Sequence, residues 1–294
     1  MVLVGVMLGL GAAIAQSLSY IFSRLYVIRR DQAIVRLLIL GHLIMGALSL
    51  LAMPLLPLAS LPPVRQYALP LVGACVFYLL GQVGMFMMLR QAEASRASPL
   101  LGLKVLILAM IYLIFRHQPL SGGQWLAVAL SVLAAFLLRT SGRRLGVGAV
   151  AWIIFACLAY SLSDMSIRAL VDALGGMGKL YASATGVCLS YILCGALALA
   201  VLPWSPRGHR GDWHYALPWA LSWWTAMLLL FGCFGTIDVI YGNIVQSTRG
   251  LISILMGPVV AWMGHVHLEP QVPRAVFLRR LLAGCVMFLA IVIF

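Results

Sequence analysis

Long apolar runs, separated by short polar and basic segments, alternate along the whole chain. A helix that crosses a lipid bilayer needs about 20 apolar residues, so the pattern predicts ten membrane-spanning helices. They cover residues 2–23, 36–58, 67–89, 97–115, 122–139, 148–170, 181–203, 215–235, 248–266 and 276–294. The run from Leu217 to Gln246 is too long for one straight span, and Gly235 and Asp238 interrupt it. Such an interruption is tolerated only where protein or water covers the backbone.

A polar, serine-rich segment occurs twice along the chain. AQSLSYIFSR, from Ala15 to Arg24 near the end of the first run, matches AYSLSDMSIR, from Ala159 to Arg168 in the sixth, at five of ten positions. Further along, SPLLG at 98–102 aligns with SILMG at 253–257. The chain is therefore expected to contain an internal repeat of five spans.

Five is an odd number, so the second repeat must enter the membrane from the opposite side to the first. The sequence thus predicts an all-α membrane protein, with ten transmembrane helices arranged as two inverted five-helix repeats over residues 1–144 and 145–294. Secondary transporters use this architecture and bind their substrates near the midplane, between the repeats. An alternative explanation of the repeated serines is close helix packing, which small residues permit.

The composition supports a membrane protein and excludes several other classes. The chain of 294 residues is 63% hydrophobic and 9% charged, whereas soluble domains carry about 25% charged residues. The six cysteines are scattered within apolar runs without a CxxC pair, so we expect them to pack as small apolar side chains and to bind no metal.

The net charge of +13 comes from basic residues that mostly lie between the apolar runs. This distribution indicates membrane orientation, and no solvated basic surface is predicted that would bind nucleic acid. Fourteen basic residues fall on one set of connecting segments and five on the other. Positive-inside logic places the fourteen in the cytoplasm, so both termini are expected outside a membrane that we take to be the bacterial inner membrane.

Five tryptophans are concentrated in one stretch of the second half. The sequence predicts an aromatic belt at one membrane interface, with a stacking site for an aromatic substrate as the alternative. The residues are Trp204, Trp213, Trp219, Trp223 and Trp224.

Lys104 is the sharpest candidate for a binding residue. It lies seven residues into its predicted span, about 10 Å deep at 1.5 Å per residue. An ionisable group there costs about 2.5–3.5 kcal/mol, so a functional role is the default hypothesis. Lys104 could pair with a substrate carboxylate or phosphate. The alternatives are snorkelling to the interface, or an ion pair with Glu93 or an acid of another helix.

Asp164 is the corresponding acidic candidate. It shares one helix face with Tyr160, Ser161, Ser163 and Arg168, and spacings of three and four residues relate it to Ser161, Tyr160 and Arg168. Asp164 could carry a proton or bind a substrate amine, or it could form an ion pair with Arg168 within its own helix. The equivalent face of the first repeat carries Gln16 and Tyr20, which we expect to line the same cavity.

Other candidates lie where spans lose their apolar character. If the chain unwinds near Asp238, its carbonyls together with Tyr241 and Asn243 form a binding niche; if the span simply ends there, these are loop residues. Arg249 is expected to meet an anion or to anchor the interface. Tyr78 and Gln82, one turn apart, are also expected to line the cavity.

The sequence resembles the EamA-type transporters of the drug/metabolite transporter superfamily. The resemblance covers ten spans and is carried by ASRASPLLGLKV, from Ala94 to Val105, and RHQPLSGGQWLAV, from Arg116 to Val128. It implies an alternating-access carrier without an ATPase module, and no Walker-type loop occurs in the chain. Members are commonly described with both ends in the cytoplasm, whereas the charge distribution here predicts the reverse.

The residues and the resemblance together predict a secondary transporter that exports a small polar or amphipathic metabolite, such as an amino acid or an organic anion. The alternative is a flippase or transporter for a lipid or sugar with an anionic phosphate headgroup. The expected partners are a small-molecule substrate, membrane lipids and a coupling proton, with no nucleic acid. No catalytic spacing joins the buried polar residues, so no enzyme activity and no cofactor are expected.

Overall fold

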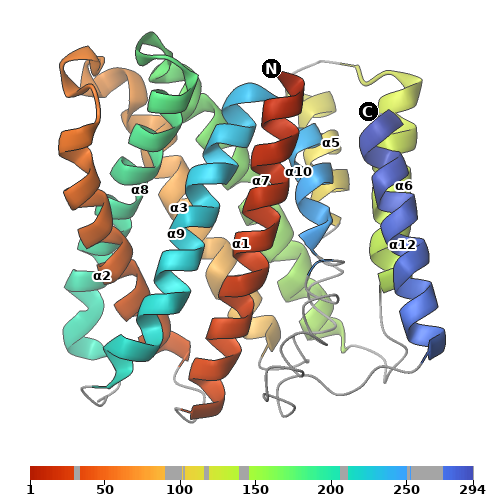
Figure 1. The fold of residues 1–294 in the computed structure, drawn as a ribbon, viewed down its shortest axis with the longest axis horizontal. Helices are drawn as coiled ribbons and strands as arrows, with labels where there is room; N and C mark the ends of the chain where they lie inside the picture. The colour runs from red at the N-terminus through yellow and green to blue at the C-terminus, as the bar shows by residue number, and fades with distance from the viewer. Residues whose placement is uncertain are drawn as a thin grey trace. The chain divides into compact units, whose positions relative to one another are not determined.

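The computed structural model describes residues 1–29, 34–89, 101, 103–115, 119–138, 146–205, 211–249, 252 and 274–293. Within these ranges the chain forms helices and no strand (Figure 1). The α-helices are α1 (Val2–Arg29), α2 (Ile34–Ala52), α3 (Val64–Leu89), α5 (Leu103–Phe115), α6 (Gly122–Leu138), α7 (Val147–Ala173), α8 (Lys179–Val201), α9 (Asp212–Thr236), α10 (Val239–Ser247) and α12 (Arg274–Ile293). Short 3₁₀ turns occur at Met53–Leu55, Leu58–Ser60, Gly175–Met177 and Leu202–Trp204. The predicted all-helical membrane fold is confirmed.

Six of the described helices are long and apolar enough to cross a membrane, and they match predicted spans one, two, three, six, seven and eight. Their spans are Val2–Ser23, Val35–Leu55, Val64–Met85, Val147–Ala173, Lys179–Trp204 and Asp212–Thr236. Shorter apolar helices at Leu103–Ile114, Gly122–Ala134 and Leu282–Ile293 lie within the fourth, fifth and tenth predicted spans. Most of the ninth, 248–266, lies outside the described residues.

The long apolar run from Leu217 to Gln246 forms two helices, and the break between them lies close to where the sequence predicts it. α9 continues through Gly235 and ends at Thr236, and α10 begins at Val239. Between them, Ile237 and Asp238 have extended backbone, with φ, ψ of −125°, 170° and −65°, 150°.

The chain divides into two compact units, each built from both halves of the sequence. Unit 1 contains Met1–Cys75 and Ser166–Ile237, and unit 2 contains Val76–Met165 and Asp238–Phe294. The predicted repeats, 1–144 and 145–294, divide the chain differently from these two units. The repeats stay a prediction.

In unit 1, α1 and α9 pack antiparallel through glycines. A Cβ added at Gly5 would lie 2.6 Å from Thr236 Oγ1, and one at Gly11 would lie 3.2 Å from Leu229. The early residues of α1 therefore lie beside the end of α9. Small residues at these positions let the two backbones approach closely.

The helices α2 and α8 also run antiparallel in unit 1. At one end Arg36 Nη1 donates to Ser205 Oγ at 2.9 Å, just beyond α8, while Arg36 Nε pairs with Asp212 Oδ2 at 3.1 Å. Further along α2, Gly46 lies against Gly195. α2 and α8 are the second span of each predicted repeat, and inverted repeats require them to run in opposite directions.

An aromatic cluster is buried in unit 1, and it corrects the prediction of a tryptophan belt. Trp219 and Trp223 are 5% and 7% exposed and stack with centroids 6.1 Å apart. Trp219 also packs edge-on against His42, and Gly41 beneath it leaves no room for a side chain. Trp204 is 80% exposed, as a belt requires. The belt interpretation is thus wrong for Trp219 and Trp223. Gly41 of α2 leaves room for the Trp219 ring to turn inward, and the indole N–H of Trp223 donates to the hydroxyl of Tyr191 on α8.

Among the described residues of unit 2, two packing centres hold the helices around the candidate site together. α6 and α12, the fifth span of each predicted repeat, run antiparallel: Ala134 packs against Ala283, and the start of α6 at Gly123 lies beside Ile293. A second centre joins the end of α3 and parts of α5 and α7, and it buries Cys157 completely. Cys157 therefore packs as an apolar side chain, as expected.

Candidate functional site

Lys104 and Asp164 form an ion pair inside unit 2. Lys104 Nζ lies 2.5 Å from Asp164 Oδ2, and the two side chains are 18% and 6% exposed. Lys104 is the second residue of α5, where the helix dipole disfavours a positive charge. The partner carboxylate on α7 offsets that cost. Of the alternatives for Lys104, the structure therefore contains the pair with an acid of another helix, while Glu93 lies outside the described residues.

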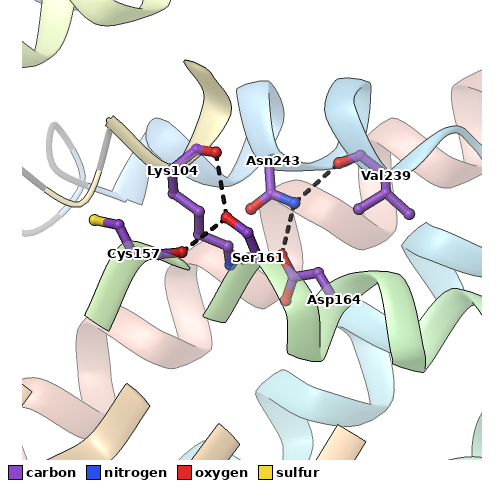
Figure 2. A network of polar contacts seen from close by, with 6 residues as sticks. All are labelled: Lys104, Cys157, Ser161, Asp164, Val239 and Asn243. Carbon is purple, nitrogen blue, oxygen red and sulfur yellow. Dashed lines mark hydrogen bonds and ion pairs between the residues drawn. The ribbon is translucent and has the colours of Figure 1, made fainter. Parts of the chain in front are cut away.

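Asn243 supplies a second donor to the same carboxylate oxygen. Its Nδ2 donates to Asp164 Oδ2 at 2.7 Å and to Val239 O, one turn back on α10, at 2.9 Å. Figure 2 shows the side chains of Lys104, Asn243 and Asp164 converging from α5, α10 and α7. Among the described residues, none donates to the other carboxylate oxygen, Oδ1. Oδ1 can therefore accept a proton or a donor group of a ligand.

The neighbouring turn of α7 attaches the ion pair to the surrounding helices. Ser161 Oγ donates to Cys157 O at 2.7 Å and lies 3.5 Å from Lys104 O, so one hydroxyl contacts the backbones of α7 and α5 (Figure 2). Lys104 Nζ is 5.8 Å from the centroid of the Tyr160 ring, within the range of about 6 Å for a cation–π contact. Gly81 on α3 makes room for that ring.

Arg249, just after α10, adds a second positive charge to this region. Its guanidinium acts electrostatically on the Asp164 carboxylate together with Lys104. The described cluster of Lys104, Asp164, Asn243 and Arg249 therefore carries two positive charges and one negative charge. Such a group favours ligands that bring an anionic group.

Asp164 does not form the alternative ion pair with Arg168. Arg168 Nε instead pairs with Asp172 Oδ2 at 2.9 Å, one turn further along α7. Arg168 Nη1 donates to the carbonyls of Phe234 and Ile237 at the end of α9. These carbonyls need a donor because a helix end has no further backbone N–H to satisfy them.

The carboxylate of Asp238 caps α10. It is exposed and accepts a hydrogen bond from Ile240 N at 2.8 Å, and the carbonyl of the preceding residue, Ile237, accepts a hydrogen bond from Arg168. The chain does unwind at Asp238, but these groups bond to the chain itself. Tyr241 is half-buried on the first turn of α10.

The remaining predicted residues lie on three helices. On α1, in unit 1, Gln16 is buried and Tyr20 packs edge-on against Trp223. In unit 2, Gln82 on α3 and Ser163 on α7 are buried, and Tyr78 on α3 is half-buried. Their roles in binding substrate stay predictions.

The described residues contain no group of three or more His, Cys, Asp or Glu side chains that could hold a metal ion. Sequence reasoning selected Lys104, Asp164 and Asn243 separately, and it missed Ser161 as the contact between α5 and α7. It also missed the attachment of Arg168 to the end of α9. The only sequence signal for a different Arg168 partner is Asp172, four residues further along.

Comparisons with known proteins agree with the helical fold. Residues 3–140 match the family described as the EamA-like transporter family, which confirms the resemblance over that part of the chain. A solved structure titled "Crystal structure of protein" superposes with a TM-score of 0.69, covering 98% of this chain and 95% of that one at 13% sequence identity. That likeness shows the fold alone. Among curated proteins, no sequence matches the chain.

Proposed function

We propose that the chain is an integral membrane transporter for a small molecule. The match of residues 3–140 to the EamA-like transporter family supports this proposal. It is a secondary, alternating-access carrier that exports a small polar or amphipathic metabolite, such as an amino acid or an organic anion. Lys104, Asp164 and Asn243 form the centre of its substrate site. We further propose that it lies in the bacterial inner membrane with both termini outside.

The buried Lys104–Asp164 ion pair is the observation that carries this proposal. Each charge costs about 2.5–3.5 kcal/mol at the centre of a span. A buried pair is weak evidence for stability, because well-packed apolar residues of similar volume often stabilise a fold as well or better. The cost is therefore better explained by a ligand that uses these charges than by folding.

The chemistry of the cluster supports a defined orientation of the substrate. A carboxylate or phosphate of the substrate bonds to Lys104 Nζ and is attracted by Arg249. An ammonium group or a proton occupies Asp164 Oδ1, which accepts no hydrogen bond from the described residues. Proton coupling follows if the carboxylate of Asp164 is protonated in one step of the cycle and ionised in another.

Uptake into proteoliposomes tests the proposal, and the two lysines of the chain provide a matched pair. The probes are radiolabelled amino acids and small mono- and dicarboxylates, measured by counterflow. Lys104→Met should abolish counterflow, whereas Lys179→Met, which removes an exposed lysine at the start of α8, should leave it unchanged. Equal activity of both variants, or no counterflow of any probe by the wild type, would exclude this function.

The excess of positive charge in the described cluster favours one second candidate function. Lys104 and Arg249 together outnumber Asp164, which suits a lipid or sugar that carries a phosphate headgroup. Vesicles with fluorescent phosphatidylglycerol in the inner leaflet distinguish the candidates. Accelerated loss of fluorescence to an external quencher would support a flippase, and an unchanged rate alongside counterflow of soluble probes would reject it.

A further inference from the structure

The side-chain amide of Asn243 is fixed in one orientation within unit 2. Its Nδ2 donates to Asp164 Oδ2 at 2.7 Å and to Val239 O at 2.9 Å, and the residue is buried. A carboxylate and a backbone carbonyl are both acceptors, so an amide turned over would place its oxygen against two other oxygens. The bond to Val239 O therefore holds the amide against its own helix, with its other N–H directed at Asp164 (Figure 2).

The two donors to Asp164 Oδ2 differ in how easily they move. Lys104 Nζ is a point charge at the end of a flexible four-carbon stem, and its side chain is partly exposed. The amide of Asn243 has a short stem and is held at a second point by Val239 O. A ligand can therefore draw Lys104 away from Asp164 more easily than it can move Asn243.

Departure of Lys104 from this contact would leave Asp164 with a buried charge. Such a charge is costly unless other groups bond to it. Asn243 remains as a donor, and hydrogen bonds to ionised groups are stronger than those between neutral groups. The carboxylate then keeps its place, because Lys104, Asp164, Val239 and Asn243 all belong to unit 2 and the contact to Asn243 does not depend on Lys104.

We propose that Asn243 is a positioning residue of the transport site. It holds the carboxylate of Asp164 while Lys104 turns from Asp164 to the anionic group of the substrate. Both N–H groups of the amide are engaged by Asp164 and Val239, so Asn243 acts through Asp164 and donates no hydrogen bond to the substrate. The turn of Lys104 rests on the proposed function, whereas the hold on Asp164 is independent of any substrate.

Carboxyl ¹³C NMR tests the hold on Asp164 without a substrate. The protein is labelled at the side-chain carboxyl carbons of its aspartates, and the signal of Asp164 is the one that disappears in Asp164→Asn. Asn243→Leu has a similar volume and no donor, so it should shift and broaden this signal, because Lys104 alone then bonds to the carboxylate. Asn243→Ala, which only removes atoms, should have the same effect.

Ser247→Ala is the matched control on α10. The hydroxyl of Ser247 donates to Ile244 O within the same helix, at 2.6 Å, so its loss should leave the Asp164 signal unchanged. An Asp164 signal that is the same in the wild type and in both Asn243 variants would overturn the inference. An equal change in Ser247→Ala would overturn it too, since the effect would then belong to α10 as a whole.

A double-mutant cycle tests the connection to transport, with exchange of the amino-acid and carboxylate probes in proteoliposomes. Asn243→Leu should raise the KM by about tenfold, as expected when a hydrogen bond to a charged group is lost. In the Asp164→Asn background the same change should have little effect, because the carboxylate that Asn243 holds is absent. A tenfold rise in both backgrounds would show that Asn243 contacts the substrate directly and would reject the positioning role. If the wild type transports no probe, the proposed function fails, and the NMR result alone decides the inference.

Discussion

Gly46 on α2 and Gly195 on α8 meet backbone to backbone in unit 1. A Cβ built on Gly46 lies 3.1 Å from the Cα of Gly195, and one built on Gly195 lies 3.0 Å from the Cα of Gly46. Neither backbone can move aside as a flexible side chain would. This crossing therefore depends on the absence of a side chain at both positions.

Substitution at this crossing should lower stability. We expect Gly195→Ala to reduce the free energy of unfolding by about 1–3 kcal/mol, the usual cost of overpacking a well-packed core. Thermal unfolding in detergent measures the effect. Gly176→Ala is the matched control, because nothing lies within 4 Å of a Cβ at that position. Equal melting temperatures for the two variants would contradict the close approach of α2 and α8.

The sequence predicts most of the helices because each long apolar run carries its own signal. The run that becomes α2 or α8 is recognisable without knowing its neighbours. The inward position of Trp219 is different, since it depends on Gly41 of another helix. A tryptophan near the end of a run looks the same in sequence whether it faces lipid or the core.

In the candidate site, too, the sequence does not predict which side chains meet. Lys104 and Asp164 could each be selected because a charge in a span is costly, but they lie 60 positions apart and nothing in the sequence pairs them. The spacing of Asp164 and Arg168 suggests a local ion pair. In the structure Arg168 bonds to the end of α9 instead, where carbonyls without backbone partners compete for its donors.

Proton coupling through Asp164 makes a specific prediction about driving force. Asp164→Asn should lose the accumulation of substrate that a pH gradient drives, because a carboxamide takes up no proton at the pH values of such a gradient. It should keep the exchange of labelled for unlabelled substrate. Asp172→Asn removes an exposed carboxylate of the same helix and should behave as the wild type. The measurement is probe content of proteoliposomes with and without the gradient. Undiminished accumulation by Asp164→Asn would rule out this residue as the proton carrier.

The charge distribution predicts the orientation of the chain in the membrane. A cysteine at Ser141, in the segment that contains Arg139, Arg143 and Arg144, should react only after the membrane is made permeable. A cysteine at Ser60, exposed between α2 and α3, should react with an impermeant maleimide in intact cells. Both cysteines are introduced into a variant in which the exposed Cys285 has been replaced. The opposite pattern would place both termini in the cytoplasm and reverse the topology.

The contribution of the Lys104–Asp164 ion pair to stability should be separable from its contribution to transport. Lys104→Met alone leaves the carboxylate of Asp164 buried without its cation, which should lower the free energy of unfolding by about 3–5 kcal/mol. Adding Asp164→Leu removes the unpaired charge, and the double variant should regain the stability of the wild type or exceed it. Thermal unfolding in detergent compares the three proteins.

Counterflow on the same preparations then decides what the pair is for. The double variant should be folded, inserted in the membrane and inactive, because it lacks the charges that meet the substrate. Restored stability together with restored transport would show that the substrate does not use Lys104 or Asp164. A double variant that remains as unstable as Lys104→Met would show that the pair is needed for folding, and the argument from its cost would then fail.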